Sequence, residues 1–169
     1  MSKRILSFVA VAGLLAFATP AMAQDGGITV YFGGGVGSAT GDLGDVTDPG
    51  FLGVAGLLFP VGGGSISIGG EGFYGSLGGT DVDDSLKLYG AMGIIDVSFG
   101  DSDGVSPYVF AGAGLLVGDT DEDSESQFGY EGGIGLALPL GGVSAWVEGR
   151  YMGSKDLDLI AFLVGLAIG

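Results

Sequence analysis

The residues of this chain that could carry chemistry are almost all acidic, and one group of them lies in a connector between two apolar stretches. Asp119, Asp121 and Asp123 occupy alternate positions of the segment 118–126. Carboxylates at alternate positions can supply the oxygen ligands that hard cations such as Ca²⁺ and Mg²⁺ prefer. The segment lacks the sixth-position glycine and the distal glutamate of an EF-hand loop. The sequence therefore leaves two interpretations open, a solvated and self-repelling loop or a weak Ca²⁺ or Mg²⁺ site.

A second group of charged residues lies inside the apolar stretches. Glu71, Glu131, Glu148 and Arg150 each interrupt a run of apolar and glycine residues, and Asp96 is a less regular fifth case. Carboxylates and a guanidinium held in an apolar interior form ion pairs and charge-assisted hydrogen bonds. We interpret the first four as a structural polar network. An ion pathway lined by the same groups and a paired-carboxylate glycosidase site are the alternatives.

Composition excludes several classes of function. The chain has no histidine and no cysteine. This excludes catalytic sites whose nucleophile is activated by an imidazole base, zinc sites with histidine ligands, and metal sites with thiolate ligands. We therefore predict no enzyme activity and no resident cofactor beyond weakly bound Ca²⁺ or Mg²⁺. The 20 acidic residues against five basic ones give a net charge of −15. This argues against a nucleic-acid partner, because binding to the phosphate backbone requires Lys and Arg side chains.

The elements that must position these residues are apolar stretches separated by two alternating kinds of connector. The long acidic connectors are 41–50, 78–85 and 118–126. The short glycine-rich connectors are 60–64, 100–106 and 139–142. Antiparallel strands that cross a bilayer show this asymmetry, with short turns on one side and longer loops on the other. The predicted strands are 28–37, 51–59, 65–77, 86–99, 107–117, 127–138, 143–153 and 157–168.

The first residues predict export. Lys3 and Arg4 precede an apolar run at 5–18, and Ala21-Met22-Ala23 forms an A-x-A cleavage site. The apolar run is shorter than the roughly 20 residues that a membrane-spanning helix requires. We predict a signal peptide at 1–23 and a single domain at 24–169.

The later apolar stretches favour a closed sheet. Each is broken by glycine or charge before about 18 residues, so a chain that spans a membrane with them must do so as a barrel. Glycine, at 38 of 169 residues, suits strands that bend and crowd in a narrow barrel. We predict an all-β fold, an eight-stranded antiparallel up-and-down transmembrane β-barrel, in the outer membrane of a Gram-negative bacterium.

Alternation along the strands predicts which side chains face lipid. In 143–153, Trp146, Glu148 and Arg150 share the inward phase, while Val147 and Tyr151 face outward. In 127–138 the same pattern predicts Glu131 inward and Ile134 outward, and in 157–168 it predicts Phe162 outward. Aromatic residues near strand ends are expected to form girdles at the two membrane interfaces. They are Tyr31, Phe32, Phe51, Phe59, Phe73, Tyr74, Phe99, Tyr108, Phe128, Tyr130 and Tyr151.

Three segments carry a resemblance to a known family. PYVFAGAGLLVG at 107–118, FGYEGGIGLALPL at 128–140 and VSAWVEGRYM at 143–152 resemble strands of small outer-membrane β-barrels of the opacity/OmpA-like group. The matching positions are Pro107-Tyr108 with Gly112 and Gly114, Phe128-Gly129-Tyr130 with Gly133 and Gly135, and Glu148-Gly149-Arg150-Tyr151. The resemblance implies an architecture and carries no catalytic residues.

Together these observations predict a non-enzymatic outer-membrane barrel with a structural or surface-interaction role and a lumen closed by side chains. A narrow porin-like channel for ions or small solutes is the first alternative. An exported soluble barrel of the lipocalin kind, binding a small apolar ligand, is the second. Expected partners are outer-membrane lipid, lipopolysaccharide and the barrel assembly machinery. Divalent cations could bridge the chain to the phosphates of lipopolysaccharide. The oligomeric state is left open.

Overall fold

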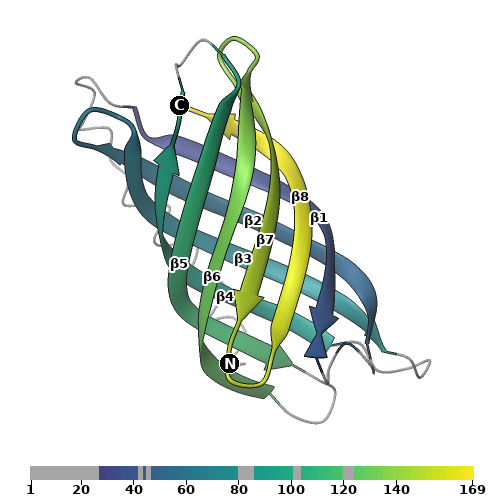
Figure 1. Ribbon diagram of the computed structural model, residues 1–169. Coiled ribbons are helices and arrows are strands. Elements are labelled where there is room, and N and C mark those ends of the chain that lie inside the picture. The colour runs from purple at the N-terminus through teal and green to yellow at the C-terminus, as the bar shows by residue number, and fades with distance from the viewer. Residues whose placement is uncertain (1–26, 42–43, 45–46, 80–85, 101–103, 120–123) are drawn as a thin grey trace, which may run out of the picture.

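The computed structural model describes residues 27–41, 44, 47–79, 86–100, 104–119 and 124–169, which form a closed barrel of eight antiparallel strands (Figure 1). The predicted signal peptide at 1–23 lies outside these residues. The strands are β1 (Thr29–Thr40), β2 (Thr47–Val61), β3 (Ile66–Gly79), β4 (Leu86–Ser98), β5 (Ser106–Asp119), β6 (Ser124–Pro139), β7 (Ser144–Gly153) and β8 (Asp158–Ile168). The predicted fold class is confirmed.

Each strand pairs with its neighbour in sequence, and β1 pairs with β8 to close the barrel. The closing ladder runs from Val30 opposite Ile168 to Thr40 opposite Asp158. Closure leaves no strand edge with unpaired backbone groups, which the hydrocarbon of a membrane would not tolerate. The short β2–β3 turn at one end contains Gly62, which adopts a positive φ of 59° that favours glycine. We call the end with the short turns the turn end and the opposite end the loop end.

Several strands run further toward the loop end than the apolar pattern predicted. β1 continues to Thr40 rather than ending at 37, β2 begins at Thr47 rather than 51, and β6 begins at Ser124 rather than 127. The added residues are mostly polar or small. Backbone pairing continues past the apolar stretch because it depends on neighbouring strands rather than on side-chain hydrophobicity.

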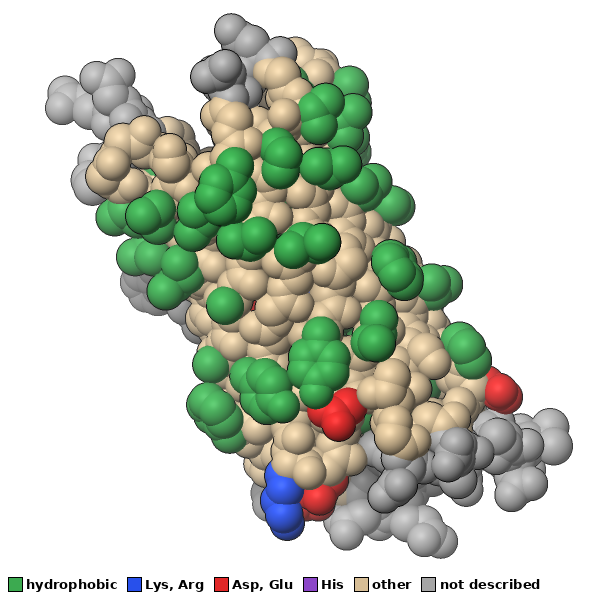
Figure 2. Space-filling model, viewed as in Figure 1, with side chains coloured by type: hydrophobic (Ala, Val, Ile, Leu, Met, Phe, Trp, Pro, Cys, Tyr) green, Lys and Arg blue, Asp and Glu red, His purple; other side chains and the backbone are tan. Residues whose placement is uncertain are grey.

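The outer wall of the barrel is apolar. Ile134 and Phe162 are both 68% exposed, and their strands alternate with buried inward positions as predicted. Figure 2 shows apolar side chains over the visible wall, with charged side chains gathered toward the loop end. This arrangement is the reverse of a soluble barrel, which buries apolar residues and exposes polar ones, so the lipocalin-like alternative is set aside. Within the described residues, no helix is long and apolar enough to cross a membrane.

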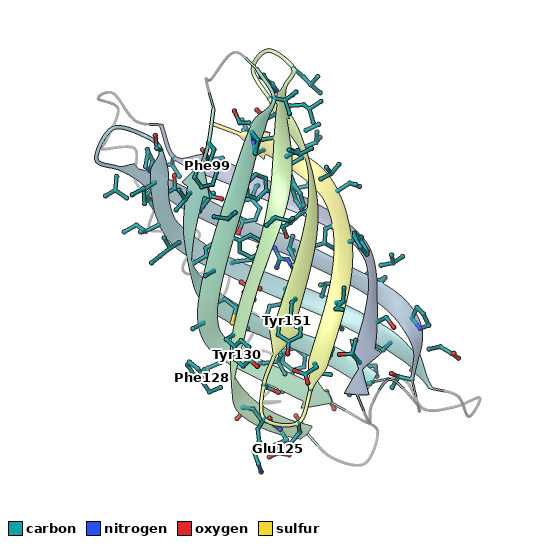
Figure 3. The ribbon with its side chains drawn as sticks, in the orientation of Figure 1. Phe99, Glu125, Phe128, Tyr130 and Tyr151 are labelled. Carbon is teal, nitrogen blue, oxygen red and sulfur yellow. The ribbon has the colours of Figure 1, made fainter. Side chains whose placement is uncertain are left out.

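Outward aromatic residues lie toward both ends of the wall. Figure 3 shows Phe99 toward the turn end, and Phe128, Tyr130 and Tyr151 toward the loop end. The rings of Tyr130 and Tyr151 lie 6.1 Å apart on the paired strands β6 and β7. Amphipathic rings at these two levels match the interfacial girdles of membrane barrels.

Candidate functional site

The candidate site is a buried ionic cluster inside the barrel, formed by Arg150 with Glu71, Glu131 and Glu148; we call it the lumenal cluster. The Arg150 Nε donates to Glu148 Oε1 at 2.7 Å, and one terminal nitrogen donates to Glu131 Oε2 at 3.1 Å. The guanidinium also binds both carboxylate oxygens of Glu71, with Nη2 donating to Oε2 at 3.1 Å. The guanidinium carbon lies 4.9 Å from the centroid of the Phe110 ring, a favourable cation–π distance.

The cluster spans the lumen rather than following one wall. Arg150 belongs to β7 and Glu71 to β3, and these strands are four apart in a closed ring of eight. They therefore lie on opposite walls, 79 residues apart in sequence. The side chains of both residues are 1% exposed. We call this Arg150–Glu71 pair, which joins opposite walls of the barrel, the crossbar. Its geometry depends on the register of the whole barrel.

Two tyrosines extend the cluster, and their positions correct the predicted girdle. Tyr31 donates its hydroxyl hydrogen to Glu71 Oε2 at 2.8 Å, and Tyr108 donates to Glu148 Oε2 at 3.0 Å. Phe73 is also buried in the lumen, at 5% exposure. These three residues were predicted to belong to the interfacial girdles because they are aromatic and lie near strand ends. Strand phase was the stronger signal for Phe73, which is two residues from Glu71 and so shares its face.

Glycines on the inner face make room for the large inward rings. A Cβ at Gly33 or Gly165 would lie 2.4 or 2.3 Å from the Trp146 ring, and a Cβ at Gly135 would lie 2.2 Å from the Tyr108 ring. Such approaches are far inside van der Waals contact, so a side chain at these glycines would displace the ring. Part of the high glycine content is therefore a packing requirement of a narrow barrel filled with aromatic side chains.

An apolar layer lies in the lumen on the loop side of the cluster. In β7, Met152 is two residues nearer the loop end than Arg150, and it lies opposite Leu159 of β8. Both are buried, at 2% and 1% exposure. The residues around a small gap in this layer are Leu52, Phe73, Leu88, Leu116, Met152, Leu157 and Leu159. The described interior is thus polar near its middle and apolar toward the loop end.

The predicted cation site is described only in part. Asp119 is the last residue of β5 and lies opposite Lys87 of β4, whereas Asp121 and Asp123 lie outside the described residues. In the segments that the structure describes, no group of three or more acidic residues could hold a metal ion. Weak cation binding by the connector stays a prediction.

Comparison with known proteins identifies relatives of the fold. A family model described as outer membrane protein beta-barrel domain matches residues 9–166. No curated protein matches the chain. Among solved structures, the attachment invasion locus protein Ail of Yersinia pestis is 16% identical with a TM-score of 0.56, and the match covers 86% of this chain and 99% of Ail.

Two further solved structures extend this comparison. The N-terminal β-barrel domain of Pseudomonas aeruginosa OprF is 15% identical with a TM-score of 0.52, covering 85% of this chain and 98% of the domain. Another structure of Ail, in complex with the heparin analogue sucrose octasulfate, has a TM-score of 0.60 at 16% identity and covers 86% of this chain and 99% of Ail. At these identities the likeness establishes a shared fold.

Proposed function

Because the chain belongs to the outer membrane protein beta-barrel domain family, we propose that it acts in that membrane as a closed, non-enzymatic barrel with a structural or surface-interaction role. The family and the barrel fold place the protein in the outer membrane. The closed lumen, the absence of turnover and the surface role are the proposal.

The observation that carries the proposal is the crossbar between Arg150 and Glu71. The Arg150–Glu71 ion pair joins opposite walls, and Arg150 also pairs with Glu131 and Glu148. These bonded side chains lie across the middle of the lumen. Eight strands leave an interior just wide enough for side chains to fill, so little space is left for a permanent aqueous path. The apolar layer on the loop side supports the same conclusion, because ions are poorly solvated among leucine side chains.

The proposed lack of enzyme activity rests on how the same carboxylates are used. Glu71, Glu131 and Glu148 all bind one guanidinium, and all three are at most 9% exposed. A glycosidase needs two carboxylates that flank an accessible sugar. These three instead compete for one cation inside the barrel.

The surface role is proposed for the long acidic connectors, which we place outside the cell. The heparin analogue bound to Ail is a polyanion. This chain, with 20 acidic and five basic residues, would repel such a ligand. We propose instead that the connector containing Asp119, Asp121 and Asp123 binds Ca²⁺ or Mg²⁺ weakly and contacts lipopolysaccharide phosphates through these ions. Membrane lipid and the assembly machinery are the other proposed partners.

Conductance across a planar bilayer tests the proposal. The unmodified protein, refolded and shown to be folded by its altered gel migration before heating, should give no large, stable single-channel currents. The Arg150→Ala variant should conduct more often because the crossbar is lost, whereas Lys155→Ala, at an 86% exposed side chain, should behave as the parent does. Large and stable currents from the unmodified protein would contradict the closed lumen and establish the narrow porin-like channel.

A further inference from the structure

The lumenal cluster holds more negative charge than its positive charge can balance. Arg150 supplies one positive charge to Glu71, Glu131 and Glu148. Of the basic residues after position 23, only Arg150 is buried, since Lys155 is exposed and Lys87 is half-buried on β4. Buried charges that lack a partner are strongly unfavourable in an apolar surrounding, and such groups commonly become neutral instead.

Hydrogen-bond donors are distributed unequally among the three carboxylates. Glu71 is bound by two nitrogens of Arg150 and by the Tyr31 hydroxyl. Glu148 is bound by the Arg150 Nε at one oxygen and by the Tyr108 hydroxyl at the other. Both oxygens of each of these two residues therefore accept a hydrogen bond, as an ionised carboxylate requires.

Glu131 is the exception. Its Oε2 accepts one hydrogen bond, at 3.1 Å, from an Arg150 nitrogen that Glu71 also binds. Its Oε1 is buried and has no hydrogen-bond partner. That oxygen lies against the Gly112 backbone of β5, where a Cβ would come within 2.8 Å of it. The side chain of Glu131 is fully buried, so solvent cannot supply the missing donor.

We propose that the barrel binds one proton from solvent at Glu131, as a neutral carboxylic acid within the lumenal cluster. A proton suits the site better than a metal ion, because the free oxygen lies against the Gly112 backbone and no group of three or more acidic side chains among the described residues could hold a metal ion. Protonation leaves two ionised glutamates, each with both oxygens bonded, around one guanidinium. The inference rests on the closed lumen proposed above, since water in an open pore would solvate the free oxygen.

The proton makes the cluster sensitive to alkaline conditions. Besides Glu131, the titratable and charged groups of the described lumen come from five strands: Tyr31 of β1, Glu71 of β3, Asp96 of β4, Tyr108 of β5, and Glu148 and Arg150 of β7. Of these, only Arg150 is positively charged. Removing the proton adds a negative charge next to Glu71 and Glu148, and the resulting repulsion weakens the crossbar.

Infrared spectroscopy of the refolded protein in lipid vesicles tests this directly, because the C=O stretch of a protonated carboxyl is separate from that of a carboxylate. At neutral pH the unmodified protein should show a protonated carboxyl band, which should vanish at strongly alkaline pH. The band should be lost in Glu131→Gln and kept in Glu125→Gln, a matched control at an exposed position of the same strand (Figure 3). It should also be kept in Asp96→Asn.

A denaturant series gives a second, independent readout. Glutamine resembles protonated glutamate, so Glu131→Gln should keep or raise the unfolding midpoint, whereas Glu71→Gln should lower it. The inference is overturned if the unmodified protein has no protonated carboxyl band, or if Glu131→Gln keeps the band. A missing band in a non-conducting barrel would refute the proton alone, whereas large currents would refute the closed lumen.

Discussion

Replacing Arg150 by methionine should destabilise the barrel more than a single surface change could. Methionine retains much of the side-chain length but removes the only positive charge of the lumenal cluster. Glu71, Glu131 and Glu148 would then lie together without a cation, and Phe110 would lose its cation–π partner. We therefore expect a large fall in the free energy of unfolding.

The magnitude follows from two estimates. Removing one partner of a buried ion pair costs about 3–5 kcal/mol. Hydrogen bonds to charged groups contribute roughly 1.5–3 kcal/mol each, and Arg150 makes several, so a simple sum would be larger. The glutamates can become protonated when the guanidinium is absent, which relieves part of the loss. We therefore predict a decrease of about 3–5 kcal/mol for Arg150→Met.

Denaturant unfolding from lipid vesicles, followed by the folded fraction on unheated gels, measures this change. Lys155→Met is the control, because the Lys155 nitrogen lies 4.0 Å from Asp156 and its side chain is 86% exposed. Exposed ion pairs of this kind contribute at most about 1 kcal/mol. The double variant Glu71→Gln with Arg150→Met should lose less than the two single changes together, because both remove the same crossbar.

A loss below about 1 kcal/mol for Arg150→Met, equal to that of the surface control, would refute this reasoning. It would mean that the crossbar does not hold the lumen together. Additive effects in the double variant would lead to the same conclusion, because independent sites add and contacting sites do not.

Three further predictions concern packing, orientation and cation binding. Gly135→Ala should destabilise the barrel because its Cβ would lie 2.2 Å from the Tyr108 ring, whereas Gly72→Ala, with no atom nearer than 3.8 Å, should have little effect in the same unfolding assay. A protease added to intact cells should cut within 118–126 and spare 139–142, and cleavage confined to the short turns would reverse the proposed orientation. Calorimetry should show Ca²⁺ binding in the millimolar range, and micromolar affinity would contradict the weak site proposed at Asp119, Asp121 and Asp123.

The strands were predictable because a membrane barrel imposes a local pattern on the sequence. Apolar residues alternate with small or polar ones along β6, and the phases predicted for β6, β7 and β8 match the buried and exposed positions. Connector length predicted that the short turns lie at one end of the barrel and the long connectors at the other. Strand ends at the loop side were less predictable, because pairing there depends on a neighbouring strand and not on hydrophobicity.

The residues of the lumenal cluster were predictable, but their partners were not. Phase alone placed Glu131, Glu148 and Arg150 on the inner face. The contact between Arg150 and Glu71 depends on the register of all eight strands, which no local pattern specifies. The sequence also did not predict that Tyr31 would face inward, because an aromatic residue near a strand end suits either an interfacial girdle or a hydrogen bond to a buried carboxylate.

The single tryptophan of the chain offers the most direct test of the closed lumen. Trp146 points into the barrel, is 5% exposed, and lies beside Tyr31 with ring centroids 6.4 Å apart. In refolded protein in lipid vesicles, its fluorescence should be shifted to the blue and should resist quenching by acrylamide and iodide added to the water. The same quenchers should act strongly once the protein is unfolded in denaturant. Quenching of the folded protein close to that of the unfolded chain would show that water reaches Trp146 and would contradict a lumen closed by side chains.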